Sequence, residues 1–242
     1  MIAGRLLARG MVAGCIAAAL AFVFARLFGE PQVDLAIAFE ATRHAAEAAH
    51  THMQEAEPVS RATQASYGLL TAVVLYGTAF GGIFSLVFAY AYGRLNAWSP
   101  RALALLLAGA GFVAFVLVPD LKYPPNPPAV GVPATLAFRT ITYFVMIGLS
   151  VSVGAIATLI GQKISQSKGA WAGSLWGVGL FIALIAAIQT AMPDVNEVPA
   201  GFPAVVLWRF REASIGMQLV LWSSMGLLFG TLAQRLLTPK AH

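Results

Sequence analysis

Three of the four histidines in this 242-residue sequence lie within nine positions, with carboxylates among them. On a helix, Glu40, His44 and Glu47 fall at i, i+4 and i+7 on one face, and His50 and His52 follow a turn later. Imidazole nitrogen and carboxylate oxygen suit borderline ions such as Co²⁺, Ni²⁺ and Zn²⁺. The spacing predicts a metal-capture site, and capture should weaken as the pH falls to around 6, because these ligands must be deprotonated.

A second interpretation of the same residues stays open. The segment has neither zinc-finger spacing nor an HExxH motif, and an exposed helix rich in Glu and His is often only a solvated surface. The residues are therefore either a transient metal-capture group or a polar face without a ligand.

The element that must carry these residues is a helix in an external segment, residues 29–66. Pro31 suits the first turn of a helix, acids lie nearby, and an alanine-rich stretch follows. These features predict a helix from Pro31 to about Gln54 that ends before Pro58.

Composition places the rest of the chain in a membrane. Only 10% of the residues are charged, 59% are hydrophobic and the mean hydropathy is +0.77, whereas a soluble domain is roughly 25% charged. Six stretches are long and apolar enough to span a bilayer as helices. They are residues 10–28, 67–93, 102–119, 140–162, 169–192 and 213–234. The sequence therefore predicts an all-α integral membrane protein, with residues 1–242 forming a single polytopic domain.

The basic residues predict the orientation, because short cytoplasmic loops are enriched in Lys and Arg. With the N-terminus in the cytoplasm, the inner loops and ends carry eight basic residues and no acid, and all ten acids lie outside. The inner residues are Arg5, Arg9, Arg94, Arg101, Lys163, Lys168, Arg235 and Lys240. Both termini are expected in the cytoplasm. The net charge of +5 includes no basic run, so we expect membrane lipid and not nucleic acid as the partner.

The predicted spans are poor in groups that could do chemistry. Apart from Arg26 near the end of the first, they contain no charged side chain and no histidine. This argues against proton-relay pumps and against an embedded enzyme, because both need titratable groups in the membrane. No GxxxxGK[ST] motif is present, so ATP is not bound through a P-loop. Met146, Met192, Met217 and Met225 would suit Cu(I) as a competing cargo, although scattered methionines usually only pack.

Two loops resemble one another. Val118-Pro119-Asp120 closes the third predicted span and Met192-Pro193-Asp194 the fifth, and each precedes a proline-rich stretch and a Phe-Arg pair. The pattern is consistent with a repeated two-helix hairpin, or with ordinary turn chemistry in two outer loops. Six prolines between Pro119 and Pro133 predict a stiff, extended segment that is either an external lid or brace, or purely structural. Four GxxxG motifs, beginning at Gly10, Gly77, Gly173 and Gly226, predict close helix packing.

Three longer motifs carry a family resemblance. They are FGEPQVDLAIAFE at residues 28–40, PDLKYPPNPPAVG at 119–131, and FPAVVLWRFREAS at 202–214, which leads to Gln218 and Leu221-Trp222. With these motifs the chain resembles the CbtA family of bacterial membrane proteins, which are regarded as probable cobalt transporter subunits. The resemblance covers essentially the whole chain.

The resemblance implies uptake of Co²⁺ across the bacterial cytoplasmic (inner) membrane for cobalamin synthesis, with no cofactor. It also implies a small partner, CbtB, with one span and a histidine-containing terminus. The expected metal-collecting residues are Glu40, His44, Glu47, His50 and His52. The expected external entrance is Glu30, Asp34, Asp120, Lys122, Tyr123, Asn126 and Asp194. The pathway candidates are Arg139, Arg209, Arg211, Ser214 and Gln218.

Two alternatives to cobalt transport stay open at this point. The chain could be an accessory or scaffolding subunit of a membrane complex, with the acidic loop as its docking surface. It could also transport another transition metal, such as Ni²⁺ or Cu⁺.

Overall fold

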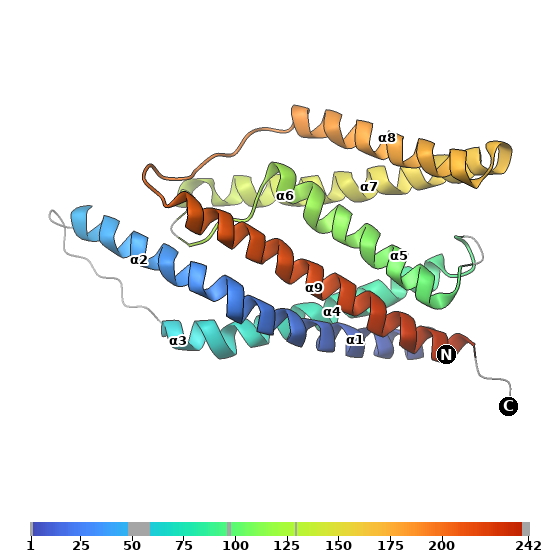
Figure 1. The fold of residues 1–242 in the computed structure, drawn as a ribbon, viewed down its shortest axis with the longest axis horizontal. Coiled ribbons are helices and arrows are strands. Elements are labelled where there is room, and N and C mark those ends of the chain that lie inside the picture. Colours follow the sequence, from blue (N-terminus) through green and yellow to red (C-terminus); the bar gives the residue numbers. More distant parts are fainter. Residues whose placement is uncertain (1, 48–58, 96–97, 129, 239–242) are drawn as a thin grey trace. The chain divides into compact units, whose positions relative to one another are not determined.

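The structure, a computed structural model, describes residues 2–47, 59–95, 98–128 and 130–238, and only the backbone of residues 44, 46 and 47. These residues form helices and no strand, and six helical stretches are long and apolar enough to cross a membrane (Figure 1). The six stretches cover 2–43, 61–91, 100–122, 133–168, 170–191 and 204–237. The predicted all-helical membrane fold is confirmed, and most helices are longer than the apolar segments within them.

In the first stretch, the boundary between the first span and the helix after it differs from the prediction. Helix α1 (Ile2–Phe24), the π-helical turn η1 (Ala25–Gly29) and α2 (Glu30–Glu47) follow one another without a break. Pro31 is the second residue of α2 and so lies in its first turn, as predicted, but α2 continues α1 through η1 and is not a separate helix. Proline lacks an N–H and clashes with the preceding turn of a regular α-helix. The wider turn, in which the Glu30 N–H bonds the Ala25 carbonyl, precedes Pro31 and lets the helix continue. Residues 48–54 of the predicted helix lie outside the described residues.

The same arrangement recurs in the third stretch. Helix α5 (Pro100–Phe112) passes through the π-helical turn η4 (Val113–Leu117) into α6 (Val118–Lys122). The sequence predicted that this helix ends at Pro119, but it continues past that residue, because a wide turn again lies directly before the x-Pro pair. The helix ends one turn later at Lys122, so the first four residues of the segment predicted to be extended, 119–122, are helical. Residues 123–132 form no helix or strand where the structure describes them, as predicted.

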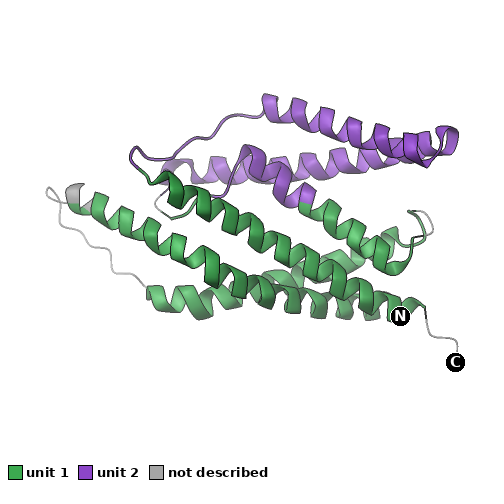
Figure 2. Cartoon of the chain, in the orientation of Figure 1, with its two compact units in different colours: residues 1–112, 126–129, 202–242 green, residues 113–125, 130–201 purple. Residues whose placement is uncertain are grey.

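The remaining helices follow in order. The second stretch consists of α3 (Arg61–Thr63), the π-helical turn η3 (Gln64–Gly68) and α4 (Leu69–Ala91). The 3-10 turn η5 (Pro133–Thr135) leads into α7 (Leu136–Lys168), which is followed by α8 (Ala170–Ala191) and α9 (Ala204–Leu237). Contacts divide the chain into two compact units (Figure 2). Unit 1 is residues 1–112, 126–129 and 202–242, and unit 2 is residues 113–125 and 130–201. That the chain acts as one membrane domain stays a prediction.

Glycines let helices approach closely in unit 1. The GxxxG motifs of α1 and α4 face each other: a Cβ added to Gly14 would lie 2.1 Å from the Gly77 carbonyl oxygen, and one added to Gly81 would lie 2.2 Å from that of Gly10. Gly226 and Gly230 of α9 pack in the same way on Ala108 and Ala104 of α5. These motifs are helix-packing motifs, as predicted.

Helix α9 runs antiparallel to α1 in unit 1. The Arg9 guanidinium donates to the Leu232 carbonyl, and near the other end Gly216 lies against the ring of Phe24. The described ends of the chain therefore lie at the same end of this unit (Figure 1).

Unit 2 is built on the pair formed by α7 and α8. Gly173 and Gly177 of α8 approach the backbone of α7 at Gly161. Val118, Tyr123, Met146, Val153 and Ile185 form its buried apolar cluster. Here α7 and α8 form a packed hairpin, whereas in unit 1 helix α4 packs mainly on α1 and has few contacts with α5. The proposed copies of a two-helix repeat thus differ in packing, and the repeat stays a prediction.

Candidate functional site

The predicted metal-collecting residues are only partly described. Glu40 lies half-buried on α2, and the backbone of His44 and Glu47 continues the same helix. His50 and His52 lie outside the described residues. Among the side chains that the structure describes, no three from Asp, Glu, His and Cys are grouped so that they could hold a metal ion. Metal capture by the histidine segment therefore stays a prediction.

Two of the predicted entrance acids are held by one arginine. Arg61, at the start of α3, forms ion pairs with Glu30 and Asp34, with 3.0 Å between its Nη2 and Oδ1 of Asp34. The carboxylates lie one turn apart and so share a face of the helix. Glu30 is buried, with 7% of its surface exposed. A buried carboxylate is stable only when it is paired, so Arg61 joins the start of the second membrane stretch to the rod formed by α1, η1 and α2.

Three more of the predicted entrance residues, Lys122, Tyr123 and Asp194, join the two Pro-Asp loops of unit 2. Lys122 pairs with Asp194 at 2.5 Å, and the Tyr123 hydroxyl donates to the Pro193 carbonyl at 2.8 Å. The Lys122–Asp194 pair adds little stability, because 92% of the Asp194 side chain is exposed and water screens it. The two Pro-Asp loops, which resemble one another in sequence, contact each other in the structure. These bonds link the end of α6 to the segment after α8.

Glu197 anchors the proline-rich segment from the other side. It accepts hydrogen bonds from the Thr135 hydroxyl and the Val132 N–H, and its Oε2 lies 3.2 Å from Nε of Arg139. The bond from Thr135 is the main cause that lowers the Glu197 pKa, followed by the bond from Val132 and the charge of Arg139. The Arg139 guanidinium also lies over Gly131, where a Cβ would be 2.5 Å from Nη1 and where φ is +121°, so no other residue fits well. Arg139 therefore braces the proline-rich loop.

Two further polar contacts involve residues of α6. The side chain of Tyr143 hydrogen-bonds Asp120. Gln189 of α8 donates to the Val118 carbonyl at 3.0 Å, directly before Pro119. The amide of Gln189 thus bonds a backbone carbonyl of α6 next to Pro119 and links α8 to α6.

The remaining pathway candidates separate on α9. Arg211, Ser214 and Gln218 recur at i, i+3 and i+7 and therefore share one face. The buried residues Trp222 and Met225 continue that face, so it points into unit 1. Arg209 lies on the opposite side of the helix and is exposed. Arg211 also donates to Oδ1 of Asn126 at 2.8 Å, which places this predicted entrance residue at the Arg211 end of the polar face.

Several residues of these sites were not predicted from the sequence. Arg61, Glu197 and Gln189 each bond a partner at least 27 positions away, so no local motif marks them. One weak signal exists for Arg61, because Ser60 caps the short helix and fixes where it starts.

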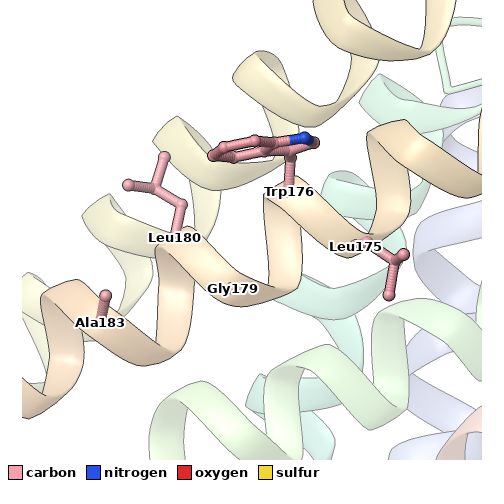
Figure 3. A pocket seen from close by; sticks show the side chains of 5 residues that line it. All are labelled: Leu175, Trp176, Gly179, Leu180 and Ala183. Atoms are coloured by element: carbon pink, nitrogen blue, oxygen red, sulfur yellow. The ribbon is translucent and has the colours of Figure 1, made fainter. Parts of the chain in front are cut away.

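An open groove on α8 has the wrong chemistry for a metal. Leu175, Trp176, Gly179, Leu180 and Ala183 line it (Figure 3), and they offer no side-chain oxygen, thioether or imidazole. A membrane helix normally presents such a surface to lipid or to another helix.

Six helices that are long and apolar enough to span a bilayer, joined by loops with paired charges, define a polytopic membrane protein. The comparison with protein families makes this specific. The family described as "Probable cobalt transporter subunit (CbtA)" matches residues 3–234, and the chain belongs to this family. No curated protein and no solved structure matches it. The family is not an enzyme class, and the term subunit implies that a second component exists.

Proposed function

We propose that this chain forms the path by which Co²⁺ enters a bacterial cell across the cytoplasmic membrane, with the polar face of α9 as part of that path. The observation that carries the proposal is the inward-facing polar face of α9 in a membrane protein of a cobalt transporter family. On this face Ser214 and Gln218 offer oxygen ligands, whereas the Arg211 guanidinium bonds Asn126. Hydroxyl and amide oxygens bind a divalent cation weakly enough to release it, as conduction requires.

The orientation follows from charge. The end of unit 1 that carries Glu30, Asp34 and Arg61 faces outside, and the end that carries both termini faces the cytoplasm. Among the described residues, Glu30 and Asp34 are paired with Arg61, Asp194 with Lys122, and Glu197 with Arg139. The outer face is therefore less acidic to an arriving cation than the sequence suggests, and this supports placing first capture in the histidine segment.

In this proposal Glu40, His44, Glu47, His50 and His52 collect the ion before it enters the membrane. A small single-span partner of the CbtB type completes the transporter. Glu30, Asp34 and Asp194 act mainly in ion pairs that keep the outer loops in place.

Reconstitution in liposomes tests the proposal. The purified full chain, with and without its partner, should admit radiolabelled Co²⁺ into vesicles. Absence of flux in both preparations would refute transport and favour an accessory role. Competition by Ni²⁺ and Cu⁺ in the same assay reports the metal preference.

Capture is tested separately with variants of the full chain. Replacing His44, His50 and His52 together by Ala should weaken Co²⁺ binding, as should lowering the pH through about 6.5. His242→Ala removes the fourth histidine and serves as the matched control. Equal Co²⁺ affinity in the triple variant and the control would leave the cluster as a polar surface.

A further inference from the structure

The inward face of α9 changes character within one turn. Up to Gln218 it carries polar side chains, and from Leu221 onward it is apolar and buried. Only 5% of the surface of Trp222 and 1% of that of Met225 is exposed, and Phe229 is fully buried. A cation that followed the polar face would meet this boundary directly after Gln218.

Gln218 ends the polar series with an unsatisfied acceptor. Its Oε1 is buried and has no hydrogen-bond partner among the residues that the structure describes. A buried amide oxygen without a partner is costly, more so where water is scarce. Its lone pairs are free to bind a cation, and amide oxygen is an accepted ligand of divalent metal ions.

Trp222 closes the space one turn further along. Its ring packs edge-on against Phe80 of α4, with 5.6 Å between the ring centroids and 85° between the planes. On the other side the ring lies on Gly111 of α5, where an added Cβ would be 2.2 Å from Cζ3. The indole thus bridges α4 and α5 from α9, and it fits only because residue 111 has no side chain.

Aromatic packing continues beyond Trp222. The Phe229 ring is 5.5 Å from that of Phe84 and 5.0 Å from that of Phe88, both nearly perpendicular to it. Ser85 follows Phe84 on α4, and its hydroxyl donates to the Gly82 carbonyl of the same helix. A hydrated ion cannot pass such a constriction until it widens and takes up water.

We propose that Gln218 Oε1 is the innermost binding position for a divalent cation in unit 1 and that Trp222 is the gate that closes the path beneath it. This inference rests on the proposed transport of Co²⁺ and assigns two residues to it. Opening requires the indole to leave the space between Phe80 and Gly111, and Gly111 is the position at which that movement can be forced.

Binding is tested without transport. Gln218→Leu removes the oxygen from the purified full chain, and the apparent affinity for Co²⁺, titrated by calorimetry in detergent, should fall roughly tenfold for the loss of one ligand. Gln218→Glu keeps an oxygen and should retain binding. Equal affinity of wild type and Gln218→Leu would remove Gln218 from the site.

The gate is tested by passive leak of radiolabelled Co²⁺ into vesicles that contain the chain without its partner. Trp222→Ala should increase the leak, and Gly111→Ala should do the same because the new methyl group displaces the ring. The double variant should leak no more than Trp222→Ala alone, since both changes act through one contact. Trp176→Ala, at a tryptophan that is 61% exposed on α8, is the matched control.

The outcomes separate the two proposals. If wild type with its partner carries Co²⁺ but Trp222→Ala and Gly111→Ala leak no more than Trp176→Ala, the gate is refuted and transport stands. If wild type carries no Co²⁺ in any preparation, the proposed function fails, whatever the variants do. Size-exclusion profiles identify any variant that fails to fold, and the smaller change Trp222→Phe, expected to leak less than Trp222→Ala, then replaces it.

Discussion

The contact between α1 and α4 gives a quantitative test at Gly81. A Cβ added there would lie 2.2 Å from the Gly10 carbonyl oxygen, 2.8 Å from Gly14 Cα and 3.0 Å from Gly10 C. All three atoms belong to the backbone, so no rotamer change can relieve the overlap. The helices would have to separate by about 1 Å to reach an ordinary C···O contact distance. Overpacking of this kind costs about 1–3 kcal/mol, and the better helix propensity of Ala returns about 1 kcal/mol.

A second glycine isolates the cost of the overlap. Gly179 on α8 also lies within a helix, but among the described residues no atom outside its own helix is within 4 Å of an added Cβ. Gly179→Ala therefore gains the same propensity without the clash. The melting temperature of Gly81→Ala, followed by circular dichroism in detergent, should lie below that of Gly179→Ala by about 2–4 °C for each kcal/mol of overlap. Equal melting temperatures would show that the α1 and α4 backbones are not in contact here and would refute the reasoning.

Two further predictions concern the ion pairs of the loops. Arg61→Ala leaves the buried carboxylate of Glu30 without its guanidinium and should destabilise the protein by on the order of 2 kcal/mol. Arg5→Ala, at an exposed arginine, should be near neutral in the same thermal assay. Adding Glu30→Gln to Arg61→Ala should restore part of the lost stability, because no unpaired charge then stays buried. Because hydrogen bonds lower the pKa of Glu197 in the folded protein, its contribution is fully present above the ordinary value of 4.5 and is lost as the pH falls below that value through the folded pKa. Protection of the proline-rich loop from hydrogen exchange should therefore decline below pH 4.5 in wild type, and a decline equally steep in Glu197→Gln would contradict this assignment.

The membrane fold could be predicted from composition, because a bilayer admits only a backbone that satisfies its own hydrogen bonds. Apolar runs of sufficient length located all six helices. Their ends were less predictable: Pro31 and Pro119 indicated breaks, but a π-helical turn before each lets the helix continue. These π-helical turns could not be predicted from the residue pattern.

The candidate site was predictable only as a set of residue types. The sequence identified Arg209 and Arg211 alike, yet the helical period places one outside and the other inside unit 1. Similarly, Glu30 and Asp34 counted as acids at an entrance, and the fold pairs both with Arg61. A charge that lies next to its counter-ion no longer attracts a distant cation with the same force.

The sequence by itself determined that this is a helical membrane protein, that it belongs with cobalt transporter subunits, and that three histidines lie together in one segment. These properties are local or compositional, because hydropathy, motifs and spacing are read along the chain. Only the tertiary structure decided that Gln218 Oε1 has no hydrogen-bond partner among the described residues and that Trp222 fills the space between Phe80 and Gly111. Those facts depend on which residues of distant helices meet, and the order of residues along one helix cannot specify that.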